Sequence, residues 1–123
     1  MISPREYSRF FRTLYNGTYL SHDLSEQTLD LLSKTNFTQG LVAGIPKDIA
    51  VSHKFGEQTI NIVNLNNQQV IRELHDCGIV YLPNNPYLIC IMTKGIDFIN
   101  LQTVIKDISK ISWDSFTSLS KKQ

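Results

Sequence analysis

A lysine and a glycine two positions apart, Lys54 and Gly56, are the residues of this chain whose types and spacing best suit chemistry. They close the run 48–57 (DIAVSHKFGE), whose first part has the β-branched and apolar character of a strand. A lysine at a strand end beside a cleft can attract an anion, and a glycine removes the side chain that would hold a ligand away from the backbone. The run therefore predicts an anion-binding strand end.

Helices are expected before this strand and after the sheet that contains it. Residues 3–16 carry the start signals of a helix, with Ser3 as the N-cap, Pro4 in the first turn and Glu6 completing a capping box. A second helix is predicted over 22–34, capped by Ser21, and a last helix over 98–112. The second helix is expected to turn four residues inward: Leu24, Thr28, Leu31 and Leu32.

Three strands are predicted, over 48–56, 74–82 and 87–93. Residues 83–86 (PNNP) predict a hairpin turn between the last two strands, and residues 57–73 read either as a hairpin extension, with a tight turn at Asn66-Asn67, or as an ordered loop. The third strand is apolar on both faces, and no further strand remains to pair with its outer edge. The predicted fold class is α+β, an antiparallel sheet of three strands with flanking helices and a flexible tail over 113–123.

The composition is that of an ordinary globular domain, with 41% hydrophobic and 19% charged residues over 123 positions. The net charge of +1 does not indicate binding to nucleic acid or to an acidic membrane surface. No run approaches the ~18 apolar residues of a membrane span, and no signal peptide is visible, which leaves a removed leader or an artificial start open. Cys77 and Cys90 stand in apolar runs and are expected to be free and buried, with a structural disulfide as the less favoured alternative.

A metal site that uses His53, His75 and Asp76 across neighbouring strands is a weaker interpretation. For each histidine, a structural role with satisfied hydrogen bonds is favoured over a role as a metal ligand. No cysteine and histidine cluster has zinc spacing, so neither a metal ion nor a cofactor is predicted.

The order of the elements and several local motifs resemble the C-terminal portion of a class A β-lactamase-like, penicillin-recognising serine hydrolase domain. Residues 3–16 resemble a late helix of that family, and residues 36–46 resemble the loop and the Gly-x-Pro lead into its active-site strand. The segment from His53 to Gly56 stands where the family has Lys-Thr-Gly or Lys-Ser-Gly. Residues 76–83 and 86–93 resemble the last two strands, and residues 98–112 resemble the closing helix.

The resemblance implies the β-lactamase/transpeptidase-like fold and a role for each residue of the motif. In such enzymes the serine of a Ser-x-x-Lys motif attacks a β-lactam or peptide carbonyl. Lys54 would anchor the substrate carboxylate, Gly56 would let the substrate approach the strand, and the backbone N–H of Glu57 would donate to the oxyanion. Phe55 lies within this substrate-binding segment, and His75 or Arg72 is the candidate to replace an arginine of the second strand.

The chain also departs from the family pattern. Phe55 takes the place of a hydroxyl residue, so a hydrogen bond to the substrate carboxylate is lost. The one Ser-x-x-Lys match, at 118–121, follows the last helix, whereas the family's motif opens a buried helix before the Lys-x-Gly strand. No Ser-x-Asn triplet occurs either, so no catalytic residue is assigned to this chain.

We therefore expect residues 1–123 to form a single, partial β-lactamase-like domain of a parent serine hydrolase, inactive alone. The residues themselves predict no compartment, whereas the family resemblance implies a parent protein outside the cytoplasm. The expected partners are the missing N-terminal part of the domain, or a second copy through the edge of strand 87–93, and a β-lactam or peptide-like substrate in the complete protein. The alternative is a non-catalytic binding or assembly module that recruits its partner through the same strand edge.

Overall fold

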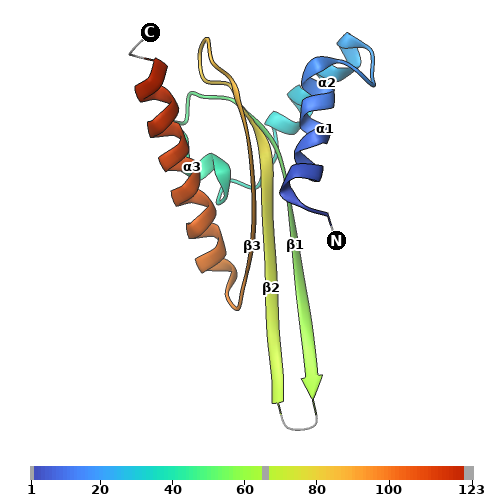
Figure 1. The fold of residues 1–123 in the computed structure, drawn as a ribbon, viewed down its shortest axis with the longest axis vertical. Helices are drawn as coiled ribbons and strands as arrows, with labels where there is room; N and C mark the ends of the chain where they lie inside the picture. The colour runs from blue at the N-terminus through green and yellow to red at the C-terminus, as the bar shows by residue number, and fades with distance from the viewer. Residues whose placement is uncertain (1, 65–66, 121–123) are drawn as a thin grey trace.

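The fold is a sheet of three antiparallel strands, in the order β1-β2-β3, with helices on both faces (Figure 1). It is described from a computed structural model, which covers residues 2–64 and 67–120. Helices α1 and α2 pack on one face, and α3 packs on the other together with η1, a short 3-10 helix at Leu41–Gly44. The predicted α+β class is confirmed.

Helix α1, Pro4–Asn16, begins and ends as its sequence predicts. The Ser3 hydroxyl accepts from the Glu6 N–H, and the Glu6 carboxylate accepts from the Ser3 N–H at 2.8 Å, which completes the capping box. The Ser3 N–H and the Ser3 hydroxyl both donate to the Glu6 carboxylate, and these two bonds hold the pKa of Glu6 below its usual range. Gly17 ends the helix in the left-handed region at a φ of 60°, which glycine adopts without strain.

Helix α2, His22–Ser33, forms where it is predicted but turns a different row of residues inward. Its buried residues are Ser25 and Leu29, whereas Leu24 is 51% and Leu31 70% exposed. The prediction of the inward row was therefore wrong for these two leucines. The reason is that α2 lies close to strand β1: the Leu29 carbonyl accepts from the Ser52 hydroxyl at 2.6 Å. Ser25, one turn earlier, faces the sheet as well, and its small side chain permits this short distance.

Strands β1, Val51–Asn64, and β2, Asn67–Val80, form one long antiparallel ribbon of 14 residues on each side. The ambiguous segment 57–73 is thus a hairpin extension, and the ordered-loop interpretation was wrong. The predicted turn at Asn66-Asn67 falls partly outside the described residues. In Figure 1 the ribbon runs well past the end of β3.

Strand β3, Tyr87–Gly95, follows the predicted turn at 83–86. Asn84 has a φ of 63°, and the Asn85 N–H donates to the Leu82 carbonyl at 3.0 Å, as a tight turn requires. Both faces of β3 are covered, because Leu88 packs in the cluster under α1 and Ile91 packs in the cluster under α3.

Helix α3, Phe98–Ser120, is longer than the predicted 98–112. Residues 113–120, predicted as part of a flexible tail, are helical because Trp113 and Phe116 pack against the end of the sheet, where Phe116 stacks on Tyr87 at 4.3 Å between ring centroids. Residues 121–123 lie outside the described part. None of the described helices combines the length and apolar character needed to cross a membrane.

Candidate functional site

The hydrogen-bond register of β1 decides which of its backbone groups are free. The Tyr81 N–H donates to the Ala50 carbonyl at 3.1 Å, so the Ala50–Tyr81 pair is a hydrogen-bonded pair of the antiparallel ladder. Such pairs alternate with non-hydrogen-bonded ones, so the pairs that contain Phe55 and Glu57 are not hydrogen-bonded. The N–H and C=O groups of these two residues therefore point away from β2, toward an edge that no described strand covers.

Lys54 brings its ammonium group to this outer edge. Its Nζ donates to the Phe55 carbonyl at 2.7 Å and lies 4.8 Å from the centroid of the Phe55 ring. The side chain is exposed, so a ligand anion can reach the charge. The cation and the Glu57 N–H thus belong to the same open strand edge.

The five predicted site residues divide between the two faces of the sheet. Side chains alternate along a strand, and register partners share a face, so Lys54, Gly56 and His75 lie on the face that α1 and α2 cover in part. The side chains of Phe55 and Glu57 lie on the α3 face.

The Phe55 ring is held by the hydrophobic core on that α3 face. It stacks on Phe37 with 4.1 Å between the ring centroids and an interplanar angle of 20°. Phe55 therefore serves as packing on the opposite face from Lys54.

Gly56 has open space on its exposed side. A side-chain carbon placed on it would meet no atom within 4 Å, whereas one on Gly78 would collide with the backbone of Ser52 and His53. Packing within the described chain thus requires the glycine at 78 but not the one at 56. The free space at Gly56 suits the approach of a ligand to the strand.

His75 pairs with Gly56 across the ribbon and lies beside Glu73. The His75 Nε2 is 3.8 Å from the Glu73 carboxylate, which also pairs with the Lys94 ammonium at 3.3 Å. The buried Nδ1 of His75 has no hydrogen-bond partner among the described residues. Arg72 lies on the α3 face, with its guanidinium 4.8 Å from the Phe98 ring centroid, so His75 is the candidate that shares a face with Lys54.

A buried histidine–aspartate pair supports the strand directly before Lys54. The Nδ1 of His53 lies 2.8 Å from Oδ1 of Asp76, and the two side chains are 1% and 0% exposed. The other carboxylate oxygen of Asp76 accepts from the Leu41 N–H at 2.9 Å, and the Leu41 carbonyl accepts from the Ser109 hydroxyl at 2.8 Å. The pair therefore fixes β1 and β2 to η1 and α3.

The structural role expected for His53 is confirmed, but its pairing with Asp76 was not predicted, although the sequence carries a signal for it. Two ionisable residues stand in strands that are otherwise apolar, and buried charges in such strands need a partner. The negative charge of Asp76 also reaches the other face, where burial raises the pKa of Tyr7 and Asp76 raises it further.

The metal site considered for His53, His75 and Asp76 does not form. His53 and Asp76 bond to each other on the α3 face, and His75 lies on the opposite face. Across residues 2–64 and 67–120, no three metal-ligating side chains come together.

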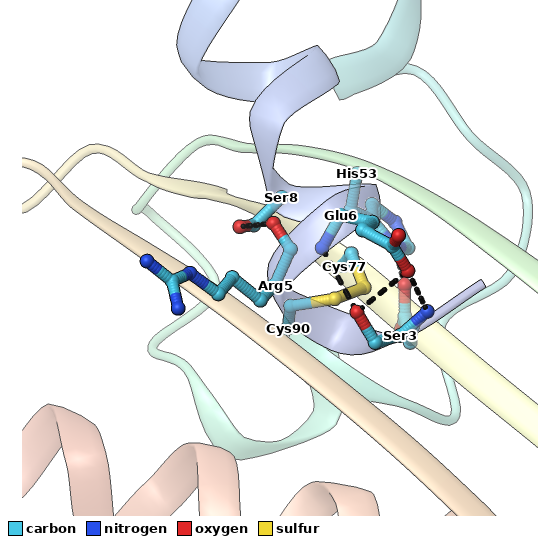
Figure 2. Close-up of a disulfide and its surroundings, with 8 residues drawn as sticks. Ser3, Arg5, Glu6, Ser8, His53, Cys77 and Cys90 are labelled. Carbon is cyan, nitrogen blue, oxygen red and sulfur yellow. Dashed lines mark hydrogen bonds and ion pairs between the residues drawn. A yellow bond between two sulfur atoms is a disulfide. The ribbon is translucent and has the colours of Figure 1, made fainter.

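A disulfide joins Cys77 and Cys90, so the expectation of free cysteines was wrong. The two residues are register partners on β2 and β3, with their Cα atoms 4.0 Å apart. Because Cys77 bonds through its backbone to β1, its pair with Cys90 is the close, non-hydrogen-bonded kind. Figure 2 shows the disulfide beside the first turn of α1, near the capping box of Ser3 and Glu6.

Comparison with known proteins identifies a family and a fold for this chain. The family model described as the beta-lactamase enzyme family matches residues 1–116. The structure of PBP-A is similar with a TM-score of 0.75 and 22% identity, and a PBP-A mutant in an acyl-enzyme complex with penicillin G is similar with a TM-score of 0.73 and 21% identity. Each match covers 94% of this chain but 40% of the PBP-A chain.

The match to PBP-A shows the fold, and its coverage shows that this chain spans less than half of the length of the PBP-A chain. None of the curated proteins compared with the chain matches it. The family model extends over all three strands and nearly all of α3. The chain belongs to the beta-lactamase enzyme family.

Proposed function

We propose that this chain is the C-terminal segment of a β-lactamase-like serine hydrolase and contributes the Lys-x-Gly strand of its substrate pocket. The observation that carries this proposal is the shared position of the Lys54 ammonium and the Glu57 N–H on the open edge of β1. A cation for a substrate carboxylate and an outward amide for a developing oxyanion are the two contributions that such a strand makes to acyl transfer.

The nucleophile and the general base are supplied from outside residues 1–123 in this account. The Ser-x-x-Lys match at 118–121 does not suit the role, because Ser118 stands at the last turn of α3 and its hydroxyl donates to the Asp114 carbonyl at 2.7 Å. The chain alone is therefore inactive. The coverage of 40% of the PBP-A chain supports a partner segment that completes the domain.

The substrate is a β-lactam or a peptide-like acyl donor with a carboxylate. Phe55 offers no hydroxyl for that carboxylate, so Lys54 carries its recognition on this strand, with His75 as the second group on the same face. The site acts outside the cytoplasm, and the Cys77–Cys90 disulfide supports this placement because disulfides persist in oxidising compartments.

The test is to find where acylation occurs. The complete protein is treated with a fluorescent penicillin, digested, and the labelled peptide is identified by mass spectrometry, with residues 1–123 alone as the second sample. The proposal expects a labelled serine outside 1–123 and no labelling of the chain alone. A label on Ser118 or on any other serine of this chain would contradict it.

The oxyanion role of Glu57 is tested by two substitutions at one position. Glu57→Pro removes the outward N–H but no ladder bond, and we expect acylation to slow by roughly 100-fold. Glu57→Ala keeps the amide and serves as the control, with acylation near the wild-type rate. Equal rates for the two variants would remove this amide from the site.

A second candidate function is a non-catalytic assembly module, favoured by the open edge of β3. The alternation that frees Phe55 and Glu57 on β1 leaves the backbone groups of residues 88, 90, 92 and 94 pointing outward from β3. Size-exclusion chromatography with light scattering separates the two functions. A dimer that becomes a 1:1 complex when the N-terminal part is added supports the hydrolase segment, and a stable monomer that ignores that part supports an independent module.

A further inference from the structure

A cavity opens between α1, α2 and the start of the sheet, on the face opposite α3. Its volume is about 610 Å³, which lies within the range of small-molecule sites, roughly 300–1,000 Å³. The end of α1 and one side of α2 form its walls, and the sheet contributes Ala50, Ser52 and Tyr81. The cavity is therefore large enough for a small organic ligand.

The hydroxyl of Ser25 lies in the wall of this cavity and makes no hydrogen bond. Ser25 is 3% exposed, and its Oγ has no partner among residues 2–64 and 67–120. Thr28 of the same helix differs, because its hydroxyl donates to the Leu24 carbonyl at 2.7 Å. Buried hydroxyl groups almost always have a hydrogen-bond partner, so Ser25 is the residue at which a polar group of a ligand would gain a bond.

Two carboxylates stand one helical turn apart on the side of α2 that borders the cavity. They belong to Glu26 and Asp30. The Nδ1 of His22 is 3.3 Å from the Glu26 carboxylate, and the Nζ of Lys34 is 2.6 Å from the Asp30 carboxylate. These exposed pairs are weak, and an ionised carboxylate accepts hydrogen bonds at about four sites. Both carboxylates can therefore accept from a further donor.

The charge of the lining favours a cationic ligand. Among the described residues, no lysine or arginine lines the cavity. His22 carries no charge in its neutral form, so the negative charge of Glu26 is less balanced than that of Asp30, which faces Lys34. An anionic ligand would be repelled by the two carboxylates, whereas an ammonium group would be attracted.

Apolar and aromatic side chains make up most of the remaining lining. They are Leu14, Tyr15, Leu29, Ala50 and Tyr81. Leu29 is buried, whereas Tyr15 is half exposed, and the Tyr81 hydroxyl lies 3.3 Å from the Ser52 Oγ. Small-molecule sites commonly combine such apolar walls with a few placed polar groups, and aromatic faces attract cations. The lining suits a molecule that joins an apolar body to a cation.

We propose that this cavity binds a small amine. Its ammonium group pairs with the carboxylates of Glu26 and Asp30, and its apolar body packs on Leu14 and Leu29. A hydroxyl or carbonyl on that body bonds to the Ser25 hydroxyl. The ligand class is thus a primary amine that carries an apolar or aromatic body and one further polar group.

This site is independent of the proposed function. In the described part of the chain, none of the residues from Lys54 to Glu57 lines the cavity. In Figure 1, α1 and α2 lie beside the sheet at the end away from the projecting end of the β1–β2 ribbon. The amine site therefore stands or fails without regard to whether the complete protein is acylated by penicillin.

Three related probes test the ligand class on the wild-type complete protein, so the result does not depend on how any variant folds. Tyramine has the ammonium, the aromatic body and the hydroxyl, and isothermal titration calorimetry is expected to show that it binds. Phenethylamine lacks the hydroxyl and should bind about 5-fold more weakly. The acid 3-(4-hydroxyphenyl)propionate lacks the cation and should not bind. Absence of tyramine binding, or equal binding by the acid, would overturn the proposal.

Substitutions in α2 locate the site. Glu26→Gln is expected to weaken tyramine binding at least about 10-fold, because it removes a charged hydrogen bond. Asp23→Asn is the matched control, since it removes a carboxylate of the same helix that does not line the cavity, and binding should be unchanged. Equal binding by the wild-type protein and Glu26→Gln would overturn the proposal.

Ser25→Ala tests the role of the buried hydroxyl. Tyramine should lose about 5-fold in affinity, whereas phenethylamine, which has no group to bond there, should bind Ser25→Ala as it binds the wild-type protein. Thermal melts of each variant show that it is folded at the temperature of the titration. An equal change for the two amines would assign Ser25 a structural role and overturn its bond to the ligand.

Discussion

His53 and Asp76 bond across β1 and β2 at 2.8 Å, and neither side chain is more than 1% exposed. His53 lies immediately before Lys54, and the links from the pair through Leu41 to Ser109 tie β1 to α3.

Asp76→Ala is expected to lower the free energy of unfolding by about 3 kcal/mol, because it leaves the His53 imidazole and the Leu41 N–H buried without their acceptor. Urea denaturation measures the change. The control is Asp30→Ala, which removes an exposed pair with Lys34 and should cost less than about 0.5 kcal/mol. Similar losses for the two variants would show that the His53–Asp76 pair has no special role in stability.

The two strand glycines should respond differently to alanine. In Gly78→Ala the added carbon meets the backbone of β1, and we expect a loss of about 2 kcal/mol in the free energy of unfolding. Gly56→Ala adds a carbon in open space and should change stability by less than about 0.5 kcal/mol. Thermal melts of the two variants check this, and the reverse order of melting temperatures would refute the packing described for Gly78.

Reduction of the Cys77–Cys90 disulfide should destabilise the fold. The bond closes a loop with a sequence separation of 13, for which chain entropy gives roughly 3 kcal/mol. Urea midpoints with and without reductant measure the loss. A Cys77→Ala/Cys90→Ala double variant is the control, and its midpoint should not depend on reductant. An unchanged midpoint in the wild-type protein would contradict the bond.

Tyr87 should make the fold sensitive to strongly alkaline pH. Burial raises the pKa of Tyr87 to about 12, and its hydroxyl has no hydrogen-bond partner among the described residues. The unfolded chain releases this proton near pH ~10, so the contribution to stability is complete below pH ~10 and is lost as pH rises toward the folded value. Tyr87→Phe should flatten the fall in stability over that window. Identical pH profiles for the two proteins would show that Tyr87 does not cause it.

The sequence predicted the elements whose signals are local. The capping box of Ser3 and Glu6 and the turn around Asn84 each depend on residues a few positions apart, and both form as predicted. The strand that contains Lys54 and Gly56 was predicted for the same reason, although strand β1 continues eight residues beyond Gly56, to Asn64.

The features that were missed depend on residues brought together by the fold. The Cys77–Cys90 bond can form only because β2 and β3 pair in a register that places the two cysteines opposite each other. The residues of α2 that face inward are set by the contact between the Ser52 hydroxyl and the Leu29 carbonyl. The end of α3 contains many serine and threonine residues and therefore has the sequence character of a flexible tail. It is helical because Phe116 stacks on Tyr87 of β3. The His53–Asp76 pair likewise needs both strands in register before either residue has its partner.

The measurement that tests the central claim most directly is the rate of acylation by fluorescent penicillin in the complete protein with Lys54→Ala. Loss of a charged hydrogen bond to the substrate carboxylate should slow acylation at least about 10-fold. Lys34→Ala, which removes an exposed lysine directly after α2, is the control and should keep the wild-type rate. An unchanged rate in Lys54→Ala would mean that β1 is not the Lys-x-Gly strand of a working pocket.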